Sequence, residues 1–238
     1  MENISTADTV PLKIFQTWFT KDLSEKMRDT VEELKNNNPE FEHFLFDDKD
    51  CEEFIRLHFN EKVVNAFRRL IPGAYKADLW RYCVMYIHGG IYLDIKLRCV
   101  NGFKFINLIH KEHFVRDCQL YPYGEDVYKG VWNAFMVVKP KNEKMLQCIN
   151  QISENVEKND YCAGPYDISG PVLLGNCFTT EEKMQFNMRR WICSGDNGMM
   201  MDNQLVLDEY KGYRDENKPD DSNYYLRLWW GKNVFKMD

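Results

Sequence analysis

The sequence predicts an α/β domain with a mainly parallel central sheet flanked by helices. Short β-branched and aromatic runs alternate with stretches of helical periodicity, and the turns between them are brief. The chain has 238 residues, of which 44% are hydrophobic and 29% charged, as is usual for a soluble protein with a sizeable core. No internal repeat or low-complexity linker divides it, so we expect one domain over 1–238.

The first elements are short and well marked. The runs 13–19 and 41–46 are β-branched and aromatic, which is typical of strands. Ser24 is a suitable N-cap for a helix through 35, and Asn36 to Pro39 ends that helix. Two further helices are expected over 49–58 and 61–70.

The segment 74–94 contains the strongest helix and the strand that follows it. The helix over 74–88 ends at Gly89-Gly90, which supplies the positive-φ residue that closes a helix. The strand 91–94 ends on Asp94, and ligands of parallel sheets collect beyond the carboxyl ends of strands. Later we expect a strand over 133–138, a helix over 144–156, a turn at 195–198 and a polar loop over 211–223.

Two groups of charged residues are candidates for chemistry. Asp78 and Arg81 share one face of the 74–88 helix. They form either a surface ion pair, worth under ~1 kcal/mol, or a buried pair that a polar ligand completes, and the residues alone do not separate these interpretations. Asp94 could cap the turn after its strand, with Lys96 neutralising its charge. Alternatively, Asp94 contacts a hydroxyl of a ligand or a metal, and Lys96 contacts a phosphate.

Charge and composition exclude several function classes. The net charge of −6 and the absence of a Lys/Arg-rich block argue against nucleic-acid binding. No apolar run is long enough to span a bilayer and the first residues lack a secretory signal, so we expect a cytoplasmic protein in a bacterial, viral or host cell. The eight cysteines are scattered without zinc spacing, and we expect reduced, mostly buried thiols.

KIFQTW at 13–18 and AYKADLWRYCVMYIHGGIYLDIK at 74–96 occur in an order that resembles DxD-motif glycosyltransferases of family 32. This family includes initiating α-mannosyltransferases and the capsular-polysaccharide and toxin-type sugar transferases. NAFMVVKP, SGPVLLG and LWWGKNVF, at 133–140, 169–175 and 228–235, resemble its later blocks. The resemblance implies a GT-A-like domain, with nucleotide-sugar binding in 1–100 and the acceptor side in 101–238.

The resemblance also implies a set of site residues. Asp78 and Arg81 would bind hydroxyls of the transferred sugar. Tyr92 and Asp94 would line the ribose and diphosphate. Gln16, Thr17 and Trp18 would hold the nucleotide base, Trp18 by stacking on it. The backbone of Gly73 and Ala74 would approach the base or the ribose. Trp229 and Trp230 would either close over the diphosphate or anchor the C-terminal segment. Core packing is the alternative for Trp18.

The sequence departs from the family pattern at one position. The triplet is Asp94-Ile95-Lys96, where the family has a second aspartate that binds the metal. Three outcomes are open: Lys96 replaces a Mn²⁺ or Mg²⁺ ion, a metal binds through Asp94 with diphosphate oxygens and water, or activity is lost.

The sequence therefore predicts a retaining hexosyltransferase that uses a UDP- or GDP-sugar and a glycan or other hydroxyl acceptor. Asp78, Arg81, Asp94 and Lys96 are the expected catalytic residues. The alternative is a weakly active or inactive module that binds nucleotide-sugars or glycans. A phosphate-ester hydrolase ranks lower, because no further carboxylate cluster or nucleophile motif is present.

Overall fold

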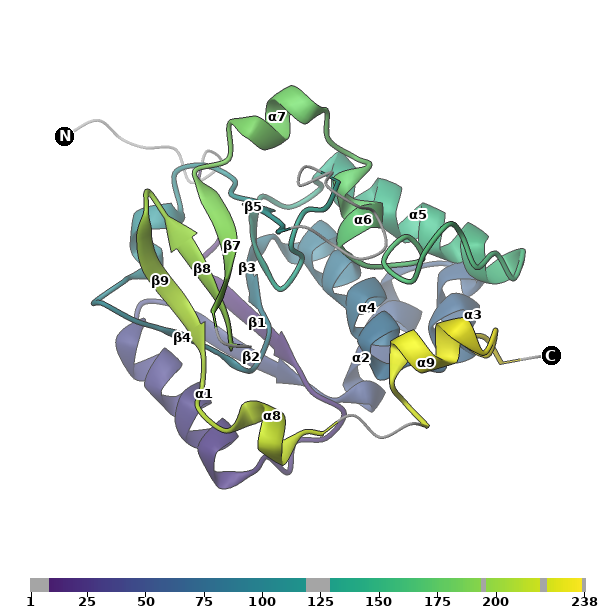
Figure 1. The fold of residues 1–238 in the computed structure, drawn as a ribbon, viewed down its shortest axis with the longest axis horizontal. Coiled ribbons are helices and arrows are strands. Elements are labelled where there is room, and N and C mark those ends of the chain that lie inside the picture. The colour runs from purple at the N-terminus through teal and green to yellow at the C-terminus, as the bar shows by residue number, and fades with distance from the viewer. Residues whose placement is uncertain (1–8, 119–128, 194–195, 219–221, 237–238) are drawn as a thin grey trace.

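In the computed structural model, the protein is described over residues 9–118, 129–193, 196–218 and 222–236, and Figure 1 shows its fold. The order of elements is the predicted alternation of strands and helices in the first half, followed by a region with more strands than expected. Among the helices in these residues, none is long and apolar enough to cross a membrane.

A four-stranded sheet in the order β2-β1-β3-β6 forms the centre. β1 (Lys13–Thr17) pairs in parallel with both β2 (Glu42–Phe46) and β3 (Gly90–Leu93). β6 (Phe135–Val138) pairs antiparallel with β3 and forms one edge. The predicted α/β class and mainly parallel sheet are confirmed, and the carboxyl ends of β1, β2 and β3 lie at the same edge.

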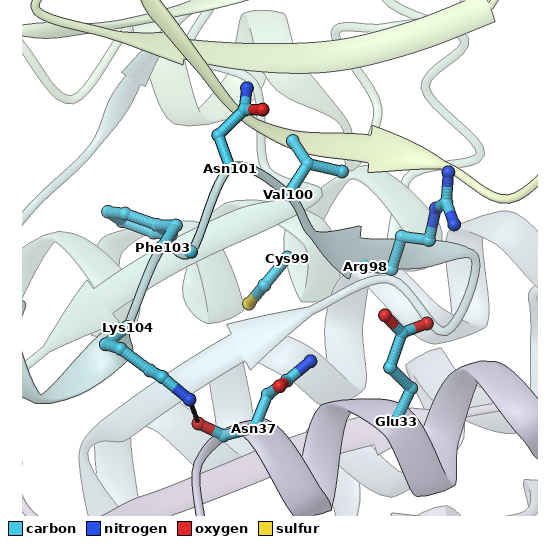
Figure 2. Close-up of a pocket in the computed structure, with 9 residues that line it drawn as sticks. Glu33, Asn37, Arg98, Cys99, Val100, Asn101, Phe103 and Lys104 are labelled. Atoms are coloured by element: carbon cyan, nitrogen blue, oxygen red, sulfur yellow. Dashed lines mark hydrogen bonds between the residues drawn. The ribbon is translucent and has the colours of Figure 1, made fainter.

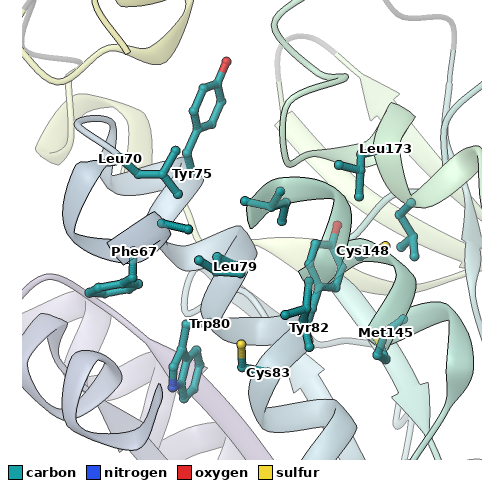
Figure 3. Packing of buried hydrophobic residues seen from close by; sticks show 14 of the residues in the cluster. Phe67, Leu70, Tyr75, Leu79, Trp80, Tyr82, Cys83, Met145, Cys148 and Leu173 are labelled. Atoms are coloured by element: carbon teal, nitrogen blue, oxygen red, sulfur yellow. The ribbon is translucent and has the colours of Figure 1, made fainter. Parts of the chain in front are cut away.

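Helices cover one face of this sheet with the larger part of the core (Figure 1). α4 (Gly73–His88) packs against β1, β3 and α5 (Glu143–Glu157), and α2 (Asp48–His58) and α3 (Glu61–Arg69) lie beside it. Figure 3 shows Tyr82 of α4 close to Cys148 of α5 within this core. Because α4 is apolar over most of its circumference, its two central charges are carried into the interior.

The opposite face carries α1 (Glu25–Asn37) and a second sheet that the sequence did not predict. This sheet has the order β4-β9-β8-β7-β5 and is mostly antiparallel. Asp202 and Asn203 form the turn between two of its strands, both with positive φ, as such two-residue hairpin turns require. The strands are β4 (Leu97–Cys99), β5 (Val115–Arg116), β7 (Met188–Cys193), β8 (Asp196–Met201) and β9 (Gln204–Glu209).

Two local predictions need correction. The turn expected at 195–198 is wrong for Asn197 and Gly198, because both pair with β7 inside strand β8, while residue 195 lies outside the described residues. The loop expected over 211–223 contains a short helix, α8 (Tyr213–Glu216), which begins after Gly212 in the left-handed region. The other short elements are η1 (Phe105–Leu108), α6 (Pro171–Gly175), α7 (Thr180–Met184) and α9 (Tyr225–Trp230).

Candidate functional site

The candidate site lies where the three parallel strands end. Thr17 ends β1, Phe46 ends β2 and Asp94 directly follows β3. Asp94 is also tied to the neighbouring edge strand, because its backbone N–H donates to Ala134 O at 2.8 Å. This edge of the sheet is the usual ligand position in α/β proteins.

α4 brings the other two predicted charges to the same place. Asp78 and Arg81 lie in its first half and are 7% and 6% exposed. The interpretation as a solvent-exposed ion pair is therefore wrong, since the helix presents this face to the interior. Arg81 Nη2 lies 3.3 Å from Asp78 Oδ1, and Arg81 Nη1 lies 3.3 Å from Asp94 Oδ1.

Arg81 joins the helix to the strand ends. Besides the two carboxylates, its guanidinium donates to Asn133 O at 2.7 Å and to Ala77 O at 3.2 Å. It also lies over the ring of Tyr92, 4.5 Å from the ring centroid. A buried guanidinium with partners on three sides is held in one orientation, so the two carboxylates are held with it.

Asp78 is held from the later part of the chain. Asn133 Nδ2 donates to Asp78 Oδ1 at 2.9 Å, and Ser169 Oγ donates to Asp78 Oδ2 at 2.8 Å. Tyr82 OH in turn donates to Ser169 O at 3.1 Å. Asn133 and Ser169 are therefore direct partners of Asp78 in the structure.

Asp94 is shared between two cations and a phenol. Tyr92 OH donates to its Oδ1 at 3.0 Å, on the oxygen that also faces Arg81. Lys96 Nζ lies 3.2 Å from its Oδ2. The side chain of Asp94 is 21% exposed and that of Lys96 is 22% exposed, so this end of the group faces solvent while Asp78 lies deeper.

The two carboxylates differ in their proton affinity. Burial raises the pKa of Asp78 to about 6, although Arg81 and the hydrogen bond from Ser169 oppose the shift. Burial also acts on Asp94, but the positive charges of Lys96 and Arg81 outweigh it and lower the pKa of that carboxyl. Asp94 therefore keeps its negative charge across the whole neutral and mildly acidic range.

Asp78 should make the free energy of unfolding depend on pH. Because its pKa is higher in the folded than in the unfolded chain, the native state binds more protons between pH 3.8 and about 6. The contribution of protonated Asp78 to the free energy of unfolding is thus fully present below about pH 3.8 and is lost as the pH rises through about 6. We expect Asp78→Asn to gain on the order of 2 kcal/mol relative to wild type between about pH 4 and pH 7.

Urea unfolding of both proteins at a series of pH values measures this difference. Stability curves of wild type and Asp78→Asn that run parallel from pH 4 to 7 would contradict the assignment.

Gln16, Thr17 and Trp18 were predicted to hold the nucleotide base. Some of them lie in the core, and the others lie at the edge of the candidate site. Gln16 is fully buried with His43 Nε2 2.8 Å from its Oε1, and its Nε2 has no hydrogen-bond partner in the described chain. Thr17 Oγ1 donates to Phe46 O at 3.0 Å. Trp18 is half-buried and lies at the strand end, 6.3 Å from the ring centroid of Tyr213, so of these three it is best placed for stacking.

Tyr213 is a site neighbour that the sequence did not suggest. Its ring lies 5.4 Å from Lys96 Nζ, and it connects Lys96 to Trp18. It comes from α8, in the segment expected to be a polar loop. The aromatic residues 210 and 213 were the available signal, since an aromatic pair is unusual in a solvated loop.

The observed contacts of the remaining predicted residues are with other parts of the chain. Gly73 opens α4 and its N–H donates to Asn223 Oδ1 at 2.7 Å, while Ala74 beside it is exposed. Trp229 is buried and donates through Nε1 to Tyr161 O at 2.8 Å, which fits the anchor alternative for this residue. Trp230 is 64% exposed and stays a predicted covering residue.

A separate pocket of about 500 Å³ lies between α1 and the segment after β4. Figure 2 shows Glu33 and Asn37 of α1 facing Arg98 and Lys104 across it. Arg98 is paired with Asp208, and Lys104 donates to the carbonyl of Asn37. Both basic side chains that line this pocket are thus paired within the protein, and none of its lining residues belongs to the group of Asp78, Arg81, Asp94 and Lys96. The candidate site is therefore the charged group at the ends of the strands and not this pocket.

Comparison with known proteins agrees with this placement. Residues 24–115 match the family described as "Glycosyltransferase sugar-binding region containing DXD motif", and this range includes α4, β3 and the triplet at 94–96. Residues 24–115 therefore resemble the sugar-binding region of DXD-motif glycosyltransferases. The matched range contains Asp78, Arg81, Asp94 and Lys96, whereas Asn133, Ser169 and Tyr213 lie beyond it.

Two fungal relatives match over a similar length. An initiation-specific alpha-1,6-mannosyltransferase of Candida albicans is 29% identical over 91 residues, covering 36% of this chain and 24% of that protein. Inositol phosphoceramide mannosyltransferase 3 of Schizosaccharomyces pombe is 30% identical over 90 residues, covering 38% and 25%. The chain thus aligns with about a quarter of the length of these relatives.

A solved structure shares the fold. PaToxG Glycosyltransferase superposes with a TM-score of 0.58 at 17% identity, covering 73% of this chain and 70% of that chain. The likeness therefore extends well beyond the sugar-binding region and includes part of the second half of the chain.

The literal Asp-x-Asp triplet within 24–115 is Asp48-Lys49-Asp50, not Asp94-Ile95-Lys96. In the structure, the residues around it form the start of α2. Asp47 accepts from the N–H groups of Lys49 and Asp50, Asp50 accepts in return from Asp47, and Asp50 pairs with Lys21 at 2.6 Å. This triplet is explained by helix capping, and the position after β3 remains the candidate.

Proposed function

We propose that this chain transfers a hexose from a UDP- or GDP-sugar to a hydroxyl group of a glycan or another acceptor, with retention at the anomeric carbon. One observation carries the proposal: an ion-paired group of buried Asp78 and Arg81 with partly exposed Asp94 lies at the ligand edge of the sheet, inside the range that matches the sugar-binding family. Since both fungal relatives are named mannosyltransferases, mannose is the first hexose to test.

The contacts of the group suggest how the donor is divided among its members. Ser169 engages Oδ2 of Asp78, while Asn133 and Arg81 engage Oδ1, so Oδ2 keeps the larger share of lone pairs for a sugar hydroxyl. The more exposed Asp94 and Lys96 would face the ribose and the diphosphate. Trp18 would stack on the base, which suits either uracil or guanine.

In this proposal the chain is one GT-A-like domain over 1–238. The donor occupies the half over 1–100, and the acceptor enters from the half over 101–238. Two residues of the second half, Asn133 and Ser169, hold Asp78 and thereby link the two halves.

The proposed reaction needs no carboxylate base. The bond from the anomeric carbon to the phosphate oxygen breaks, and the acceptor oxygen forms its bond on the same face. The acceptor's proton passes to the departing phosphate oxygen, so the products are a glycoside and a nucleoside diphosphate. Positive charge beside that phosphate stabilises the leaving group as its negative charge grows.

A second candidate is a module that binds nucleotide-sugars without turning them over. The observation that favours it is Lys96, which stands in the position of the second motif aspartate and is paired with Asp94. Binding and turnover separate the two candidates.

Thermal unfolding of the purified protein with UDP, GDP, UDP-glucose and GDP-mannose tests binding. At about 100 times its Kd, a ligand should raise the Tm by about 5–10 °C. Release of UDP or GDP from the sugar that gives the shift then measures turnover, with and without glycan acceptors. A shift without turnover would favour the second candidate, and the absence of any shift and any turnover would contradict both.

A further inference from the structure

We infer that Lys96 takes the place of a divalent cation, so that the donor's diphosphate is bound and released without metal. This inference rests on the proposed function and concerns the charge balance of the same site. It is carried by the contacts of Asp94, by the charges around it and by the partial exposure of the Lys96 side chain.

The oxygen atoms around Asp94 do not suit a metal ion. Mn²⁺ and Mg²⁺ prefer several carboxylate, carbonyl or water oxygens in a near-octahedral arrangement. Oδ1 of Asp94 is engaged by Tyr92 and Arg81, and Oδ2 faces the ammonium of Lys96 at 3.2 Å. In the part of the chain that the structure describes, no three His, Cys, Asp or Glu side chains gather as metal ligands.

A cation next to Lys96 would also be repelled. An ammonium group carries three N–H donors and no lone pair, so it cannot act as a ligand. A divalent ion bound to Oδ2 of Asp94 would lie within a few ångströms of Nζ, where like charges repel strongly in a partly buried site.

The charges of the site balance without an ion. Asp78 and Asp94 carry one negative charge each, and Arg81 and Lys96 carry one positive charge each, linked in one series of ion pairs. With an aspartate at position 96, the same four residues would have a net charge of minus two, which one divalent cation would neutralise. The exchange of an aspartate for a lysine therefore supplies the same two units of charge as the ion.

Lys96 is placed so that its ammonium group can reach a ligand. Its backbone is held, since Tyr210 N–H donates to Lys96 O at 3.0 Å and β4 begins at the next residue. Its side chain is 22% exposed and lies over the ring of Tyr213. A flexible stem on a fixed backbone lets Nζ turn from Asp94 to a phosphate oxygen, and lysine is a common phosphate ligand.

The test measures UDP and GDP binding by isothermal titration calorimetry, in EDTA and in Mn²⁺. For wild type we expect the Kd to differ by less than about 3-fold between the two conditions. For Lys96→Asp we expect weak binding in EDTA and a gain of more than about 10-fold in Mn²⁺. Lys96→Met should bind weakly in both conditions, because it has neither the charge nor a metal ligand.

Electron paramagnetic resonance of Mn²⁺ provides a readout independent of affinity and turnover. Compared with the same Mn²⁺ and UDP or GDP without protein, wild type should leave the signal of free Mn²⁺ unchanged, whereas Lys96→Asp should reduce it further. Circular dichroism establishes that both variants are folded. The wild-type measurements need no substitution, so a variant that fails to fold leaves the inference testable.

The possible failures are distinguishable. Wild-type nucleotide binding that requires Mn²⁺, or tightens more than about 10-fold with it, overturns this inference and leaves the proposed function intact. Nucleotide binding that Lys96→Met leaves unchanged also overturns it, since another group would then hold the diphosphate. No binding of UDP or GDP under any condition overturns the proposed function and this inference together.

Discussion

Replacing Arg81 with alanine should lower the free energy of unfolding by about 3–5 kcal/mol, because it leaves the buried carboxylate of Asp78 and the partly exposed carboxylate of Asp94 without their shared cation. Arg81 is 6% exposed and pairs with Asp78 and Asp94, so little water can take its place. The substitution also removes the hydrogen bond to Asn133 O and the contact with the ring of Tyr92. Urea unfolding at pH 7 measures the loss.

Arg68→Ala is the matched control for this substitution. Arg68 pairs with Glu52 at 2.7 Å, but both side chains are more than a third exposed, and we expect a loss below about 1 kcal/mol. If Arg81→Ala does not fold, Arg81→Lys keeps the charge with a shorter reach and fewer donors, and should still cost on the order of 2 kcal/mol. A loss for either Arg81 variant no larger than that of Arg68→Ala would contradict the central role of Arg81.

Asp94→Ala should reduce donor turnover by about 10²–10³-fold or abolish it, because Asp94 pairs with Lys96, which would face the diphosphate, and with Arg81, which holds Asp78. Without its carboxylate, Lys96 loses its only ion pair among the described residues, and Arg81 keeps Asp78 alone. Nucleotide release from the donor identified by thermal shift measures this effect. Nucleotide affinity, measured in parallel, separates a loss of binding from a loss of turnover.

Asp208→Ala serves as the control for Asp94→Ala. Asp208 also accepts from a basic side chain, Arg98, but it lies on β9 outside the candidate site. We expect this variant to retain turnover within about 3-fold of wild type, since a partly exposed ion pair outside the site contributes little to the stability of the fold. Near-normal turnover of a folded Asp94→Ala protein would contradict the site assignment.

Most of the elements in the first half could be predicted from local patterns. The helix that became α4 was predicted to within a residue at its start, and its end at Gly89 was marked by the glycine pair. The strand that ends at Leu93 followed from three strand-favouring residues, Ile91, Tyr92 and Leu93, between that pair and Asp94. Such signals are local, because periodicity and capping are set by residues within one or two turns.

The second sheet could not be predicted in the same way. β8 contains Asn197, Gly198 and three methionines, and β7 contains two arginines, so neither has a regular apolar alternation. These strands form because they pair with one another and with β9, and strand preference depends strongly on such partners. The turn expected at 195–198 was wrong at Asn197 and Gly198 for this reason.

The sequence by itself determined the family resemblance, the α/β class and the identity of Asp78, Arg81, Asp94 and Lys96 as residues to examine. Their order along one helix and one strand end was sufficient for that. Only the tertiary structure decided that Arg81 lies between the two aspartates, that Ser169 holds Asp78 from 91 positions away, and that Tyr213 covers Lys96. Spacing along a helix defines which residues share a face, but whether that face is buried, and against which partners, depends on segments that meet only in the folded chain.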